Sequence, residues 1–182
     1  MLAIVNLSDL FSDMLKDIYY AEKKILKALP KMAKKLGKDS ELAAAFEKHR
    51  QETEGQVERL EQVFQIIGEK PKAKKCMAVE GITEEADELM SEVKCKETLE
   101  AGLLAGAQAV EHYEIARYGT LVEWAKLLGH DEAVQLLEET LEQEKKTDEI
   151  LNKMAMDEIN QKAMEAQQGR EEDEGHSHRR AA

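Results

Sequence analysis

The sequence predicts an all-α protein, a bundle of four long helices, and three observations support this fold class. Apolar residues recur at alternating three- and four-residue steps in four long stretches, the pattern of helices buried along one face. Only 4% of the 182 residues are aromatic, 35% are charged and two are prolines, which is typical of helical bundles. Glycines or helix-capping residues separate the stretches.

The first helix is expected from about Ser8 to Gly37. Its buried stripe holds one acid, Glu22, in the middle of seven apolar residues: Phe11, Leu15, Ile18, Ile25, Leu29, Met32 and Leu36. An ionised carboxylate in such a stripe costs several kcal/mol unless a partner compensates it. Pro30 lies inside this span and is expected to kink the helix or break it briefly.

The second helix is expected from its caps, Asp39 and Ser40, to about Ile67. Its predicted stripe has a polar centre, with Glu54 and Glu61 on its border, and consists of Phe46, Arg50, Thr53, Val57, Leu60, Phe64 and Ile67. A long crossover connection follows, with a short extra helix expected over residues 83–93. A connection this long can cross the height of a bundle and make the flanking helices parallel.

The third helix is expected from about residue 97 to 128, with Glu111 and Glu114 at the centre of an otherwise apolar stripe. After a tight turn, the fourth begins at Asp131 and carries Glu144 and Asp148 on its predicted inner face. The chain therefore divides into a bundle over residues 1–164, made of two antiparallel hairpins, and a charged tail over residues 165–182 that is expected to be disordered.

Counting from the turns predicts that the acids meet. Glu22 lies 16 residues before Lys38, and Glu54 lies 16 residues after it. Glu114 and Glu144 each lie about 15 residues from the second turn. Because antiparallel helices rise equally per residue, all four helices bring carboxylates to the middle of the bundle.

Clustered carboxylates repel one another, which makes a metal site the leading interpretation. The candidate ligands are Glu22, Glu54, Glu111, Glu114, Glu144 and Asp148. Two divalent ions per chain would offset most of this charge, and an oxygen-only set favours Fe or Mn over Zn or Cu. In the alternative, the acids are protonated, turned to the surface, or paired with Arg50, Lys23 and Arg117. No catalytic residue is assigned.

The net charge and the two cysteines indicate which classes of partner and which cellular compartment to expect. The net charge of −12 and the pI near 5.0 argue against nucleic acid and anionic membranes as partners. No stretch approaches the roughly 20 apolar residues of a membrane span. The N-terminus lacks the features of a signal peptide, and Cys76 and Cys95 are expected to be free thiols, although they could pair. We expect a cytoplasmic protein.

The acidic pattern resembles known metal proteins. One Glu on each of two helices and Glu-x-x-His on each of the other two mark the ferritin-like, rubrerythrin-like di-iron bundles, and Glu111-His112-Tyr113-Glu114 resembles the Glu-x-x-Glu of a rubrerythrin-like third helix. More closely, residues 17–22, 52–61, 75–77 and 111–121 resemble the YciE/YciF family of bacterial stress proteins. This resemblance implies a ferritin-like fold and a homodimer.

The chain also departs from the di-iron pattern. Val57 and Thr147 stand where di-iron enzymes carry the His that follows Glu54 and Glu144, so a degenerate site remains open. The leading hypothesis is a stress-response protein with a dinuclear Fe or Mn site that reduces peroxide or O₂, using a separate electron donor. The competing hypothesis is a metal-free bundle that dimerises and binds a protein partner. An iron-storage cage is a third, less favoured, possibility.

Overall fold

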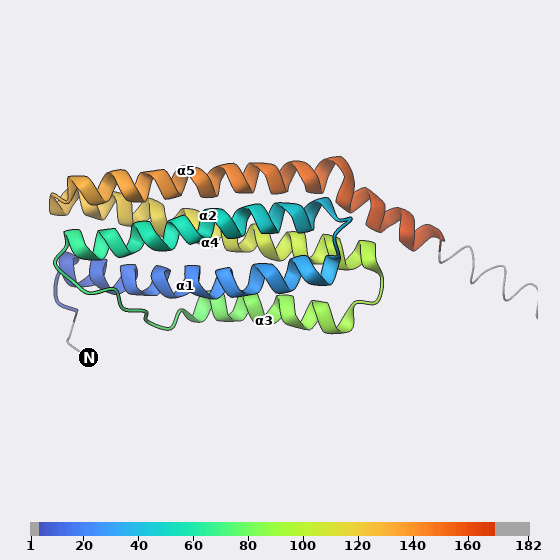
Figure 1. Ribbon diagram of the computed structural model, residues 1–182, viewed down its shortest axis with the longest axis horizontal. Helices are drawn as coiled ribbons and strands as arrows, with labels where there is room; N and C mark the ends of the chain where they lie inside the picture. The colour runs from blue at the N-terminus through green and yellow to red at the C-terminus, as the bar shows by residue number, and fades with distance from the viewer. Residues whose placement is uncertain (1–3, 170–182) are drawn as a thin grey trace, which may run out of the picture.

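The computed structural model describes residues 4–169, and this part of the chain consists of helices and their connections, without a strand (Figure 1). A five-residue π-helix over Ala155–Ile159 follows the last α-helix, and helical structure then continues to residue 169. The α-helices are α1 (Leu7–Leu36), α2 (Glu41–Ile66), α3 (Met77–Glu92), α4 (Lys96–Leu128) and α5 (Asp131–Met154).

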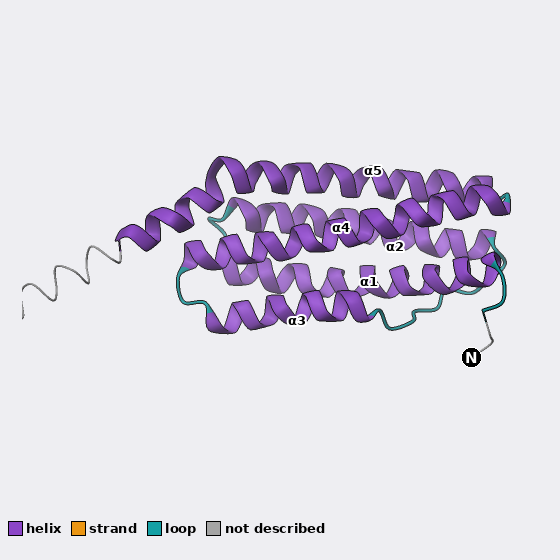
Figure 2. Ribbon diagram, turned by 180° about the vertical axis from the view of Figure 1, so that it is seen from behind, coloured by secondary structure: helices purple, strands orange, loops and turns teal. Residues whose placement is uncertain are grey.

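The four long helices form the predicted bundle of two antiparallel hairpins. α1 pairs with α2 and α4 pairs with α5, while α1 also packs on α4 and α2 on α5 (Figure 1). The crossover over residues 67–95 carries the short helix α3, which packs outside the bundle against α1 and α4 (Figure 2). α2 and α4 consequently run in the same direction, which confirms the expected effect of a long crossover.

Local sequence signals explain where the helices begin and end. Asn6 caps α1 by accepting a 2.8 Å hydrogen bond from the backbone N–H of Asp9, and Ser40 caps α2 with a 3.1 Å bond from Ala43. Gly129 ends α4 in the left-handed conformation, with φ of +75°, which suits a residue without a Cβ. α1 continues without interruption through Pro30, so no break occurs there.

The buried stripes agree with the sequence in α1 and differ in α2. All eight predicted stripe positions of α1 are buried, Glu22 included. In α2, however, Arg50 and Val57 are not buried, and the chain buries His49 and Gln56 instead. The observed stripe lies one position away from the predicted one in the middle of the helix and consists of Leu42, Phe46, His49, Thr53, Gln56, Leu60 and Val63.

Other expectations are met in part. α3 begins six residues before the predicted start at Thr83. Helical structure continues past residue 164 to residue 169, beyond the predicted boundary of the bundle, and residues 170–182 of the predicted tail lie outside the described residues. Cys76 and Cys95 are both free and buried. Within residues 4–169, none of the helices combines the length and hydropathy that a membrane-spanning segment needs.

Candidate metal centre

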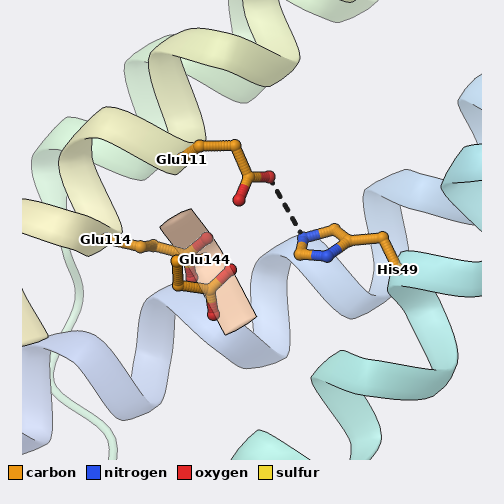
Figure 3. A group of neighbouring side chains, drawn as sticks. All are labelled: His49, Glu111, Glu114 and Glu144. Carbon is orange, nitrogen blue, oxygen red and sulfur yellow. Dashed lines mark ion pairs between the residues drawn. The ribbon is translucent and has the colours of Figure 1, made fainter. Parts of the chain in front are cut away.

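Four buried side chains meet in the middle of the bundle: His49 from α2, Glu111 and Glu114 from α4, and Glu144 from α5 (Figure 3). Each offers one potential ligand atom, and these four atoms all lie within 4.8 Å of one another. We call this group the His–Glu cluster. One imidazole and three carboxylates in such proximity form a set of donors that could hold a metal ion.

Helix geometry explains why these residues converge. Glu111 and Glu114 are three residues apart, so they lie on the same face of α4. His49 lies between Phe46 and Thr53 on the buried stripe of α2, and Glu144 faces inward from α5. The cluster therefore occupies the polar middle of otherwise apolar faces.

Glu22 of α1 adds a fourth carboxylate beside the cluster. It is 0% exposed, and its Oε1 accepts a hydrogen bond from the hydroxyl of Tyr118, which is also fully buried. The charges of Glu22, Glu144 and Glu111 each raise the pKa of Glu114, so Glu22 belongs to the same electrostatic site. All four long helices thus contribute a buried polar side chain.

Most of the buried polar atoms in this region have no hydrogen-bond partner. His49 Nε2 lies 3.3 Å from Glu111 Oε1 and His49 Nδ1 lies 3.9 Å from Glu52 Oε2, but neither contact has the geometry of a hydrogen bond. The carboxylate oxygens without a partner are Glu22 Oε2, Glu111 Oε2, both oxygens of Glu114, both of Glu144, and Asp148 Oδ1. Because an unsatisfied buried carboxylate is costly, these oxygens indicate that something else binds or protonates them.

Burial changes the proton affinity of every member of the site. Burial raises the pKa of Glu22 to about 7, although the hydrogen bond from Tyr118 opposes this shift. Burial, and then the neighbouring carboxylates, raise the pKa of Glu114 and Glu144 well above the usual range. For His49, burial lowers the pKa, but Glu111 and the other nearby carboxylates outweigh it, so the net pKa is raised.

Basic side chains do not neutralise these acids. Among residues 4–169, no Lys or Arg forms an ion pair within 4 Å of Glu22, Glu111, Glu114 or Glu144. The guanidinium of Arg59 lowers the pKa of Glu22 only at longer range, because it hydrogen-bonds Thr140 and Glu139 instead. Of the sequence alternatives for these four acids, surface exposure and pairing with basic residues are therefore absent, and protonation remains.

Two predicted ligands lie elsewhere. The expectation that Glu54 faces the interior is wrong, because its side chain is 52% exposed and pairs with Arg50 across one turn of α2. Asp148 lies at the border of the site, with its side chain 17% exposed and its Oδ1 3.2 Å from His112 Nε2. Its charge still raises the pKa of Glu111, so it is a neighbour of the cluster.

His49 is the site residue that the sequence argument missed. The available signal was the spacing: stepping from Phe46 by three residues instead of four reaches His49, and the following steps reach Thr53 and Gln56. The predicted stripe and the observed stripe both include Phe46 and Thr53. Because the middle of α2 is polar, the sequence did not decide between them.

Comparisons with known proteins give the family. Residues 6–164 match the family model described as a domain of unknown function, DUF892. The chain is 45% identical over 159 residues to YciF of Escherichia coli K12, covering 87% of this chain and 95% of that protein.

Solved structures agree with this relationship. The crystal structure of the E. coli stress protein YciF matches with a TM-score of 0.81 and 44% identity, over 86% of this chain and 99% of that one. YcfI of Rhodopseudomonas palustris matches with a TM-score of 0.80 and 47% identity, over 83% and 96% of the two chains. A protein from Xanthomonas campestris pv. campestris matches at 0.67 with 25% identity, over 89% and 98%. These matches confirm the ferritin-like helical bundle, and the chain belongs to the DUF892 family, the family of the stress protein YciF.

Proposed function

We propose that this chain is a stress-response protein with a dinuclear Fe or Mn site in the core of the bundle, which reduces peroxide or O₂. The observation that carries the proposal is the convergence of three buried carboxylates and one imidazole, whose ligand atoms lie within 4.8 Å of one another, with the buried carboxyl group of Glu22 beside them. The name of the E. coli relative as a stress protein supports the cellular context.

The residues present fit such a centre in charge and in chemistry. Glu22, Glu111, Glu114 and Glu144 carry four negative charges when ionised, which two divalent ions would balance. Glu111, Glu114, Glu144 and His49 are the ligands that we propose, with Glu22 completing the set and Asp148 at the border. A mixed set of carboxylates and imidazole suits Fe and Mn.

The chain contributes a buried site and a carboxyl group with a raised pKa. Bound Fe or Mn would supply the electrons for reducing peroxide or O₂. Tyr118 orients Glu22 by donating to Oε1, which leaves Oε2 of the same carboxyl group unpartnered and inward. Without a metal, burial raises the pKa of Glu22 to about 7, so this carboxyl group would release its proton near neutral pH when an ion binds. The residues of the site are at most 5% exposed, which limits their contact with bulk water.

Further parts of the proposal concern partners. We propose a homodimer in the cytoplasm, in line with the resemblance and the reduced cysteines. Electrons would come from a separate protein, because the two cysteines of the chain, 76 and 95, form no Cys-x-x-Cys pair. Size-exclusion chromatography with light scattering tests the dimer against the chain mass of 20.6 kDa.

Metal loading tests the proposed function. The protein is reconstituted anaerobically with Fe(II) or Mn(II), desalted, and analysed for metal by mass spectrometry. We expect about two ions per chain, with a loss of metal in Glu114→Gln and no loss in the matched surface variant Glu54→Gln. Oxidation of the ferrous protein by peroxide or O₂, followed by its absorbance, then tests the reaction. Metal well below one ion per chain, or the same content in both variants, contradicts the proposal.

The metal-free bundle keeps one specific observation in its favour. Burial and the neighbouring carboxylates raise the pKa of Glu114 and Glu144 well above the usual range, which favours the neutral form of both carboxyl groups in a metal-free bundle. The reconstitution experiment separates the two functions, because a metal-free scaffold gains no stoichiometric metal.

A further inference from the structure

An apolar cavity of about 60 Å³ lies directly beside the His–Glu cluster. His49 and Glu111, the pair joined by the dashed line in Figure 3, form its polar end. All five α-helices contribute apolar side chains to the rest of its wall, among them Ile25, Leu29, Phe46, Ile82, Val110 and Leu151. The proposed function assigns no role to this cavity.

The polarity of the wall determines what the cavity can hold. A buried water needs two to four polar partners, and apolar cavities without them stay dry. The hydroxyl of Thr83, which also lines the cavity, is already bonded to the carbonyl oxygen of Val79 at 2.8 Å. The other polar side chains of the wall also have partners: Thr147 Oγ1 donates to the carbonyl oxygen of Gln143 at 3.1 Å, and Lys48 and Glu52 form a 3.5 Å ion pair. The buried polar atoms of the wall without a hydrogen-bond partner are those of His49 and Glu111, at the end next to the cluster. Hydrogen peroxide would lose its hydrogen bonds along the apolar part of this wall.

The size of the cavity excludes larger apolar ligands. An engineered apolar cavity of about 150 Å³ holds benzene or xenon. At about 60 Å³, this cavity is too small for an aromatic ring or an extended acyl chain, but it suits a diatomic molecule or a single xenon atom. It also reaches the surface between α2 and α5, where the exposed residues Lys48 and Ile150 line it.

We infer that this cavity is a holding site for dioxygen, which it delivers to the His49–Glu111 side of the cluster. The inference rests on the proposed function and names O₂, rather than peroxide, as the oxidant that the site receives by this route. With two ferrous ions held by the cluster, the balanced reaction would be O₂ + 2 Fe(II) + 2 H⁺ → H₂O₂ + 2 Fe(III), with the protons taken from water. The apolar cavity meets the polar cluster at His49 and Glu111. These residues are 5% and 1% exposed, and both have polar atoms without a hydrogen-bond partner.

Gly106 offers a way to fill the cavity. It lines the cavity, and a Cβ added there would meet no atom within 4 Å, so the first side-chain atom at this position causes no clash. Gly119 is the matched control, because it lies on the same helix, has the same free space for a Cβ, and does not line the cavity. Val110→Phe is a second filling variant, since Val110 is buried and lines the wall.

Two measurements on the full-length protein test the inference. Crystals pressurised with xenon should show xenon in the cavity of the wild type and of Gly119→Leu, and none in Gly106→Leu or Val110→Phe. In stopped-flow experiments on the ferrous protein, the filling variants should slow oxidation by O₂ about tenfold, the enrichment that a transfer gain of about 1.4 kcal/mol gives. Oxidation by hydrogen peroxide should keep the wild-type rate.

The outcomes separate this inference from the proposed function. Absence of xenon from the wild-type cavity overturns the inference whether or not metal binds. Equal slowing of the O₂ and peroxide reactions in the filling variants, or no slowing of either, also overturns it and leaves the metal centre intact. Failure of the wild type to bind metal defeats the proposed function, and the role of the cavity in oxidation is then lost with it, even if xenon binds.

Discussion

Replacing Glu114 with leucine removes a carboxylate that is fully buried and has no hydrogen-bond partner at either oxygen. In the metal-free protein this change should be stabilising, because a buried carboxyl group without a hydrogen-bond partner carries a desolvation cost of about 1–3 kcal/mol that leucine does not. A gain of about 2 kcal/mol raises the Tm by about 4–8 °C in a chain of this size. The variant also relieves Glu22 and Glu144, whose carboxyl groups share the site.

The metal-loaded protein should respond in the opposite direction. A ligand at about 100 times its Kd stabilises the folded state by about 2.7 kcal/mol. The wild type should gain this stability from Fe(II) or Mn(II), whereas Glu114→Leu should lose most of it. Calorimetry under anaerobic conditions, with and without metal, measures both effects. Glu54→Leu is the control, because Glu54 is exposed, and it should keep the full metal-dependent gain.

Two results would refute this reasoning. One is a metal-free Glu114→Leu protein that is less stable than the wild type, because the buried carboxylate would then be compensated within the protein. The other is an equal metal-dependent rise in Tm for the wild type and Glu114→Leu, because the ion would then bind outside the His–Glu cluster.

Further predictions concern pH, Tyr118 and His49. The stability of the metal-free protein should fall as the pH rises from about 5 to above 7, since the folded chain keeps a proton on Glu22 up to a pKa of about 7 while the unfolded chain releases it near 4.5. Glu22 alone should lower the free energy of unfolding by about 3 kcal/mol over this pH range. Bound metal should reverse the trend, because protons compete with the metal for the carboxylates. Thermal melts across this pH range, with and without metal, measure both effects. Tyr118→Phe should cost about 1–3 kcal/mol in urea unfolding, since Glu22 Oε1 loses its donor, and a change below about 0.5 kcal/mol would contradict this. His49→Gln should weaken metal binding about tenfold or more in a competition titration, and an unchanged Kd would exclude His49 as a ligand.

The fold followed from the sequence where one helix face is clearly apolar. In α1 every predicted stripe position is buried, because seven strongly apolar residues define the direction of the face. The length of the crossover likewise predicted that α2 and α4 run parallel. The start of α3 was predicted late because Cys76 and Met77 carry no capping signal: Cys76 makes no side-chain cap.

The sequence predicted the level of the site residues along the bundle axis, but only partly the direction in which their side chains point. Counting residues from the turns placed the acids at one level, and Glu22, Glu111, Glu114 and Glu144 are all buried there. Counting does not give the direction of a side chain around its helix, which depends on the phase of the stripe. α2 buries His49, Thr53 and Gln56, so its centre has no apolar face to set that phase. The predicted stripe of α2 was therefore displaced by one position, about 100° around the helix axis. For this reason the prediction placed Glu54 in the interior and did not include His49.

Anomalous diffraction from crystals of the protein reconstituted anaerobically with Fe(II), recorded at the iron absorption edge, tests the central claim most directly. We expect iron peaks in contact with His49, Glu111, Glu114 and Glu144, because the proposed centre lies where these four potential ligands converge. Crystals of stoichiometrically reconstituted protein with no peak in the core, or with iron bound only to surface carboxylates, would contradict it.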